Sequence, residues 1–318
     1  MSELVLTIQS GDTLYYPTVL NGVTWETERS GSPSKLTFTV LKDQNISFNE
    51  GDSVTFSYDG NRVFFGYVFT KKRTKEHHIE VTAYDQMRYL KNKYSYAFEN
   101  KTATEIIKSV CQDFGVKTGE LEDTGYVIKS MFEENQTLFD IFLDALDETL
   151  QNTGKLYILY DNGGTLELKE LSNMATNVLI DEDTAQDFTY TSSIDKDTYN
   201  KIVLYYVNEQ KEHIPYVAKD DYTIDKWGLL QYFEEVKSQS IAWDKSKTLL
   251  SLYNRKNKEL KISNAFGNPS ARAGSLVVVN LNLGDMVTSN YMLVEKATHK
   301  FEENNYTMEL TMNGYWGD

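Results

Sequence analysis

SVTFSYDGNRVFFGYVF, residues 53–69, is the stretch that decides the expected fold. Every second residue of its first segment is apolar, which is typical of a half-buried strand. Asp59-Gly60 then forms a turn that tolerates positive φ angles, and residues 63–69 return as a second strand. Gly66 interrupts the return strand, which indicates a bulge or a sharp bend of the kind that small barrels need.

The segments on either side of this hairpin repeat the strand pattern. Residues 3–9, 35–41 and 79–83 all alternate between apolar and polar side chains. Short strands, turn signals and an interrupted strand together are typical of a small antiparallel barrel. We therefore expect a first β-barrel over residues 1–92.

Beyond residue 92 the apolar period changes from two residues to the helical spacing. Thr102 and Glu105 form a capping box, the apolar residues after it recur at helical spacing, and Gly115 can end that helix. A second helix is expected from about Thr137, followed by a hairpin that turns at residues 161–164. Residues 93–180 therefore predict an α+β domain.

The strand pattern returns in residues 181–318. The expected strands are residues 201–207, 275–283, 291–297 and 306–312. Between them Ser240 to about Leu260 has the pattern of an amphipathic helix, and Gly267-Asn268-Pro269 breaks the chain. This predicts a second β-barrel, interrupted by an insertion at about residues 213–270.

The expected fold class is therefore mainly β with an α+β part. Two small antiparallel β-barrels flank the α+β domain, and the second barrel carries a helical insertion. The ends of the two β regions also look alike, because Tyr67-Val68 and Leu293-Val294 each precede a similar alternating strand. This similarity suggests an internal duplication of one barrel.

Composition limits the classes of function. The chain of 318 residues has a net charge of −15, and residues 93–185 alone contain 7 basic and 18 acidic residues. An acidic face repels phosphate, so we expect no specific nucleic-acid binding, although acidic residues also simply keep a domain soluble. No apolar run is long enough to span a membrane, and the first residues lack the pattern of a signal peptide.

A search for catalytic or metal-binding patterns is mostly negative. The four histidines lack zinc spacing, no nucleophile elbow or phosphate-binding loop occurs, and Cys111 is expected in the core. We therefore predict no metal and no cofactor. Glu133-Glu134 offers a carboxylate to a glycan hydrolase, which needs two acids facing one cleft, but adjacent acids are usually solvated.

One region is a candidate subunit interface. It combines an aromatic strand face with the basic run that follows it, and its residues are Phe64, Phe65, Tyr67, Lys71, Lys72 and Arg73. Aromatic residues at strand spacing, including Trp25, are alternatively core residues or a platform for a sugar. The basic run is alternatively a solvated loop, or it docks an acidic partner such as the middle domain of a neighbouring copy.

Four separated segments together resemble one family. They are residues 51–56 with 65–68 and 81–85, residues 101–107 with 114–116, residues 226–231, and residues 272–274 with 291–294 and 306–310. Their order and spacing are similar to those of the XkdQ/YqbQ family of phage-like tail proteins, which resembles the central baseplate hub of contractile tails. The family often has Tyr where this chain has Trp227.

This resemblance implies a structural protein of a virion or phage-tail-like particle and not an enzyme. The implied assembly is a homotrimer whose two barrels line an axial channel, with the tail tube and the central spike proteins as partners. Assembly is expected in the bacterial cytoplasm. Two alternatives remain open, a tail-associated cell-wall or glycan hydrolase and a carbohydrate-binding module.

Overall fold

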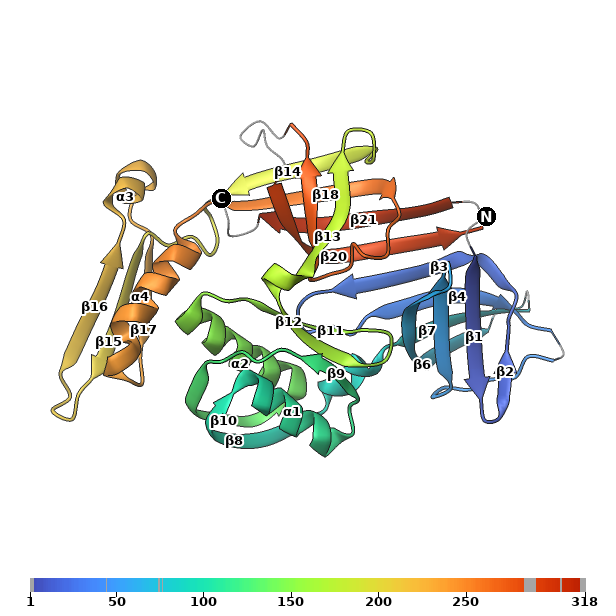
Figure 1. Cartoon of the computed structure of the whole chain (residues 1–318), viewed down its shortest axis with the longest axis horizontal. Coiled ribbons are helices and arrows are strands. Elements are labelled where there is room, and N and C mark those ends of the chain that lie inside the picture. Colours follow the sequence, from blue (N-terminus) through green and yellow to red (C-terminus); the bar gives the residue numbers. More distant parts are fainter. Residues whose placement is uncertain are drawn as a thin grey trace.

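The computed structural model describes residues 3–43, 45–73, 75, 77–282, 290–303 and 305–314. Strands predominate and helices are few, as the sequence predicts. Figure 1 shows two strand-rich halves side by side, a mixed part beneath them and a small unit that projects from one side.

The first β half contains the hairpin from which the fold was predicted. Its strands are β1 (Leu4–Ser10), β2 (Thr13–Tyr15), β3 (Val19–Glu28), β4 (Lys35–Leu41), β5 (Ser53–Tyr58), β6 (Asn61–Arg73) and β7 (His78–Tyr84). The turn between β5 and β6 has positive φ angles at Asp59 and Gly60. The register of β6 shifts once before Gly66 and once after it, so neither bulge falls at Gly66 itself. A Cβ atom at Gly66 would instead collide with the backbone oxygen of Tyr84.

The mixed part follows β7 and contains both predicted helices. Its elements are η1 (Gln86–Lys91), β8 (Lys93–Thr102), α1 (Ala103–Phe114), β9 (Thr118–Leu121), β10 (Val127–Thr137), α2 (Leu138–Thr153), β11 (Tyr157–Asp161), β12 (Leu166–Glu170) and η2 (Leu171–Met174). The capping box of Thr102 and Glu105 is present, and Gly115 ends α1 with a left-handed φ of 66°. The long β8–β10 ribbon was not predicted. Tyr94, Tyr96 and Phe98 alternate along β8, but β10 shows no alternation and most side chains of both strands are exposed.

The second β half follows η2 and is completed by the C-terminal strands. Its strands are β13 (Ala175–Asp181), β14 (Asp187–Ser193), β18 (Asn257–Phe266), β19 (Leu276–Asn280), β20 (Asn290–Glu302) and β21 (Asn305–Gly314). The predicted strand at 275–283 corresponds to β19, and Leu283 lies outside the described residues. These strands surround an apolar core that includes Ile262, Val294 and Leu310.

The small projecting unit corrects the expected insertion. Its elements are β15 (Lys201–Val207), β16 (His213–Lys219), α3 (Asp221–Trp227), β17 (Gln231–Glu235) and α4 (Gln239–Tyr253). β15 was assigned to the second barrel, but it pairs with β16 and β17 in a separate sheet, because its apolar side chains share a core with α4. Conversely β18, placed within the insertion at 213–270, belongs to the main sheet, and the helix ends at Tyr253 instead of Leu260.

One sheet of 13 strands joins the two β halves. Its order is β14-β18-β21-β20-β3-β4-β7-β6-β5-β1-β2, with β19 also pairing β20 and β13 pairing β19. The halves meet where β20 pairs antiparallel with β3, from Lys296 opposite Glu28 to Phe301 opposite Val23. Strand pairing among the described residues does not close either half, so the two separate barrels that were expected are not confirmed.

Candidate assembly surfaces and the junction that positions them

A buried polar cluster joins the two β halves to the mixed part. Asp85 follows β7 and is only 1% exposed, and Asp161 ends β11 and is only 4% exposed. The backbone N–H of Ser34 donates to Asp85 Oδ2 at 3.0 Å, and Gln86 Nε2 donates to Asp161 Oδ2 at 2.9 Å. Arg272, just before β19, donates from Nη1 to the carbonyl oxygen of Asp161 at 2.8 Å. Three distant segments of the chain therefore meet at one point.

The electrostatics of this junction are those of two carboxyl groups removed from water. Burial, followed by the charge of Asp161, raises the pKa of Asp85 to about 7, while the hydrogen bonds from Ser34 and the charge of Arg272 act in the opposite direction. Burial likewise raises the pKa of Asp161. The Arg272 guanidinium also lies 4.6 Å from the ring centre of Tyr160. The junction thus depends on one cation held between several groups, which favours a fixed relative placement of the three parts.

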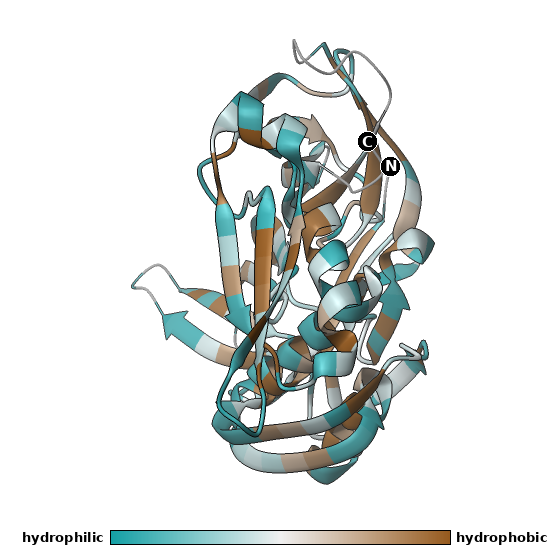
Figure 2. Ribbon diagram, turned by 90° about the vertical axis from the view of Figure 1, so that its left-hand side faces the viewer, coloured by the Kyte–Doolittle hydropathy of each residue, from teal (hydrophilic) through white to brown (hydrophobic). Residues whose placement is uncertain are grey.

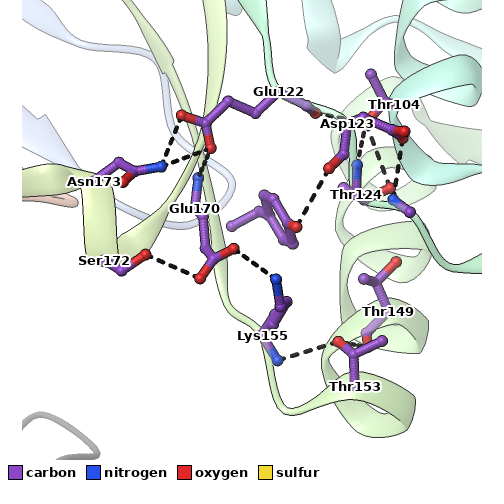
Figure 3. Close-up of polar contacts among 12 residues, drawn as sticks. Thr104, Glu122, Asp123, Thr124, Thr149, Thr153, Lys155, Glu170, Ser172 and Asn173 are labelled. Carbon is purple, nitrogen blue, oxygen red and sulfur yellow. Dashed lines mark hydrogen bonds and ion pairs between the residues drawn. The ribbon is translucent and has the colours of Figure 1, made fainter.

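A second polar network fixes the exit from the mixed part into the second half (Figure 3). Glu122 Oε2 accepts the backbone N–H of Glu170 at 2.7 Å, and Glu122 Oε1 accepts from Asn173 Nδ2 at 3.0 Å. Lys155 Nζ donates to Glu170 Oε2 at 3.0 Å, which lowers the pKa of Glu170. Because Asn173 lies in η2 and β13 begins at Ala175, this network holds the start of the second half against β9–β12.

The aromatic residues proposed as an interface divide between the two faces of β6. Phe64 is 2% exposed and lies in the core of the first half, so it has no surface to offer a partner. Phe65 and Tyr67 are half-buried on the other face, where Tyr67 lies edge-on to Phe65 at 5.7 Å and to Tyr89 at 5.9 Å between ring centres. Trp25, also 2% exposed, is a core residue and not a sugar platform.

The basic residues of the same proposal lie at the end of β6. Lys71 Nζ donates to the carbonyl oxygen of Phe48 and lies 4.8 Å from the centre of its ring. Lys72 forms an ion pair with Glu80 at 2.9 Å, and both side chains are largely exposed. Arg73 is the last residue of β6 and is exposed. These three residues therefore extend a strand and do not belong to a loop.

The two β halves have the same order of paired strands. The order β3-β4-β7-β6-β5-β1 in the first half corresponds to β14-β18-β21-β20-β19-β13 in the second. Neighbouring strands have the same relative direction throughout, except that β1 is antiparallel to β5 whereas β13 is parallel to β19. In both halves the chain visits these strands in the same sequence. In the second half the small projecting unit lies between β14 and β18, where the first half has only the short connection between β3 and β4.

The small unit presents a row of stacked rings on the outer face of its sheet. Tyr205 stacks on His213 with ring centres 4.9 Å apart and on Phe233 at the same distance, and Phe233 is 61% exposed. Figure 2, which looks onto the side from which this unit projects, shows hydrophobic segments along its strands. Rings stacked on one another present mainly their edges, whereas a sugar stacks on a ring face. This arrangement resembles a protein contact more than a carbohydrate platform.

One pocket contains carboxylates relevant to the hydrolase alternative. It has a volume of about 230 Å³, lies between β10 and α2 on one side and β17 and α4 on the other, and includes Glu133 and Asp144. Burial, followed by the charge of Asp144, raises the pKa of Glu133, while Lys237 lowers it. Burial and the charge of Asp140 raise the pKa of Asp144. The neighbouring Glu134 does not line this pocket and is exposed.

Potential metal ligands and the single cysteine were the remaining sequence candidates for chemistry. No group of three or more potential metal ligands occurs in the described part of the chain. Burial raises the pKa of the Cys111 thiol to about 12, which leaves it protonated and unreactive at neutral pH. Within the same residues, every helix is too short or too polar to cross a bilayer.

Comparison with solved structures defines the class of fold. The tail protein of Neisseria meningitidis MC58 superposes with a TM-score of 0.72 at 11% identity, over 98% of this chain and 96% of that one. An Escherichia coli component of the type VI secretion system, described as similar to the T4 bacteriophage tail proteins gp27 and gp5, has a TM-score of 0.55 at 11% identity. That match covers 98% of this chain and 76% of the other. The fold is therefore one found in phage tail proteins.

The chain belongs to the YQBQ-like family, whose model matches residues 23–313. Two Bacillus subtilis relatives, the uncharacterized protein YqbQ and the phage-like element PBSX protein XkdQ, are each 32% identical over 316 residues. The alignments cover 94% of this chain and 93% and 94% of the relatives. The resemblance noted from the sequence is thus confirmed. Two of the segments that carried it, ending at Asp85 and beginning at Arg272, meet at the buried junction.

Proposed function

We propose that this chain is the structural hub of a contractile phage or phage-like tail baseplate. As a homotrimer, it would join the six-fold tail tube to the three-fold central spike. The observation that carries the proposal is the strand order common to the two β halves, because three such chains offer six similar units to a six-fold tube. Its similarity to a phage-like element protein and to a type VI secretion component supports a place in a tail-like particle.

The proposal assigns a role to each part of the chain. The two β halves, β1–β7 and β13–β14 with β18–β21, supply the two barrel-like units around the axial channel, and the acidic α+β part between them lies outside. The hub resides in the baseplate of the particle after assembly in the bacterial cytoplasm. The basic end of β6 is a suitable complement for acidic surfaces of neighbouring copies, and such pairs set the register more than the affinity.

Sedimentation tests the hub assignment directly. The chain is measured alone and with the central spike protein of the same particle, at low and high salt. We expect a species with the mass of three chains, at least in the presence of the spike. A monomer under every condition, including with the spike, would count decisively against a hub.

The pocket around Glu133 and Asp144 is the observation that favours the hydrolase alternative. The hub proposal expects no turnover of peptidoglycan by the purified chain, compared with a lysozyme control. Turnover that disappears in Glu133→Gln or Asp144→Asn would favour the hydrolase. Glu134→Gln is the matched control, because this exposed neighbour lies outside the pocket and its loss should leave any true activity unchanged.

A further inference from the structure

Backbone hydrogen bonds show which residues of the two β halves are equivalent. In the first half Gly51 N donates to Val68 O at 2.8 Å, and Val68 N donates to Asp52 O at 2.9 Å. In the second half Gly274 N donates to Val294 O at 2.8 Å, and Val294 N donates to Ser275 O at 2.9 Å. The two glycines have φ angles of 92° and 90°. Val68 in β6 therefore occupies the same place as Val294 in β20.

The register of the next strands extends this equivalence residue by residue. β6 pairs Val68 with Ala83 and, after a one-residue shift, Thr70 with Thr82. β20 pairs Val294 with Met312 and, after the same shift, Lys296 with Thr311. The equivalent residues past the shift are therefore Thr70 and Lys296, Lys71 and Ala297, Lys72 and Thr298, and Arg73 and His299.

The same reasoning matches β14 with β3. Trp25 of β3 lies opposite Leu36, which lies opposite Ala83. Tyr190 of β14 lies opposite Leu260, which lies opposite Met312. Since Ala83 and Met312 are equivalent, Tyr190 takes the place of Trp25. It follows that Thr191 takes the place of Glu26 and Ser193 that of Glu28.

One of the two equivalent edges is occupied and the other is not. In β20 the edge past Val294 carries β3, with Thr298 opposite Glu26 and His299 opposite Trp25. The corresponding edge of β6, past Val68, has no strand beside it among the described residues. Among the same residues β14 pairs only with β18, so its other edge is also open. Six strands separate β14 from β6 along the sheet, so the two edges cannot pair within one chain (Figure 1).

We propose that β14 of one copy pairs antiparallel with the end of β6 in the next copy, in the register of the β3–β20 contact. Thr70 then lies opposite Ser193, Lys72 opposite Thr191, and Arg73 opposite Tyr190 of the neighbouring copy. This pairing rests on the proposed trimer, whose self-association contact it specifies. Each copy offers one edge and receives the other, so the contact is head-to-tail and closes a ring when three copies complete the turn.

The side chains at the two contacts suit different tasks. Within the chain, His299 stacks on Trp25 with ring centres 5.0 Å apart, and Arg29 forms an ion pair with Glu295 at 2.7 Å. Between copies, the guanidinium of Arg73 takes the place of the imidazole and stacks on the ring of Tyr190. In the same pairing the basic end of β6 would run toward Asp187, the first residue of β14.

Cysteine cross-linking tests both the pairing and its register. The full-length chain carries Lys72→Cys and Thr191→Cys, two exposed positions that directly oppose each other in the proposed pair. The matched control carries Lys72→Cys and Thr189→Cys, which lies on the same face but two residues away. The native Cys111 is buried and does not interfere. Both variants should melt within a few degrees of the unmodified chain.

Mild oxidation of the first variant should give covalent dimers and trimers and no larger species. The fraction of cross-linked chain should be at least five-fold higher than in the control. Equal cross-linking by both variants would mean random collision and would overturn the pairing. No cross-linking, while the unmodified chain sediments as a trimer, would overturn the pairing and leave the hub proposal standing. No cross-linking together with a monomer in the presence of the spike would reject both.

Discussion

The contact of β3 with β20 and the exposed end of β6 follow one backbone pattern but carry opposite kinds of side chain. β20 contributes Ala297, His299 and Phe301, all fully buried against β3. The equivalents of Ala297 and His299 in β6 are Lys71 and Arg73, of which the first is half-buried and the second exposed. An apolar seam becomes stable as the chain folds, whereas a basic edge stays soluble until it meets a partner. One repeated unit can therefore serve both a permanent contact and a contact made during assembly.

The largest expected effect comes from breaking the permanent seam. Trp25→Ala removes a ring that is 2% exposed and stacked on His299, so the free energy of unfolding should fall by about 3–5 kcal/mol. Urea denaturation measures this loss. Trp243→Ala is the control, because Trp243 lies on α4 and is 48% exposed, and it should cost less than about 1 kcal/mol. Equal losses of unfolding free energy in the two variants would show that the β3–β20 seam stabilises the fold no more than an exposed ring does.

A second prediction concerns acid stability at the same seam. Burial lowers the pKa of His299 to about 4. In the unfolded chain a histidine takes up its proton near pH 6.5, so folded stability is present above that value and is lost as the pH falls towards 4. At about 1.4 kcal/mol per pKa unit, the loss should reach about 3 kcal/mol. Urea titrations between pH 7 and 4 should show it in the native chain and not in His299→Gln. An unchanged slope in that variant would contradict the assignment.

The junction at Asp85 should respond in the opposite direction. Its pKa is raised to about 7, so its contribution to stability is fully present below the unfolded value near 4 and is lost as the pH rises through 7. This net shift already includes the opposing hydrogen bonds from Ser34 and the charge of Arg272, so at about 1.4 kcal/mol per pKa unit the effect should be about as large as at His299. Asp85→Asn should remove this loss in melting curves between pH 4 and 8. A loss of equal size in both proteins would exclude Asp85 as its source.

The smallest effect is expected at the basic edge itself. Lys72→Gln breaks an ion pair between largely exposed side chains, so the free energy of unfolding should change by at most about 1 kcal/mol. If the end of β6 is a contact between copies, the same variant should weaken the salt dependence of self-association, because the positive charge of Lys72 is removed from that contact. Sedimentation at low and high salt measures that dependence. A large loss of stability, or no change in salt dependence, would place Lys72 in the fold instead of the contact.

The local features of this fold were readable from the sequence because each depends on neighbouring residues. The hairpin of β5 and β6, the capping box at Thr102 and the left-handed end of α1 at Gly115 all agree with the structure. The ribbon of β8 and β10 was missed, although Tyr94, Tyr96 and Phe98 alternate along β8, because its partner β10 is mostly exposed and shows no alternation. The basic residues Lys71, Lys72 and Arg73 lie at the end of β6, and their part in an interface stays a prediction. Phe64 was misplaced, because alternation alone does not say which face of β6 is the core.

The sequence by itself determined the strand-rich class, helix α1 with both its caps, the start of α2 and the family. Only the tertiary structure decided which strands pair. It placed β15 in a small separate sheet, returned β18 to the main sheet, and joined β3 to β20 across more than 260 residues. Helix caps and turns are fixed by interactions within a few residues, which a sequence displays directly. Strand partners are chosen by the burial of both faces at once, so a strand's own sequence does not say which other strand it will pair with.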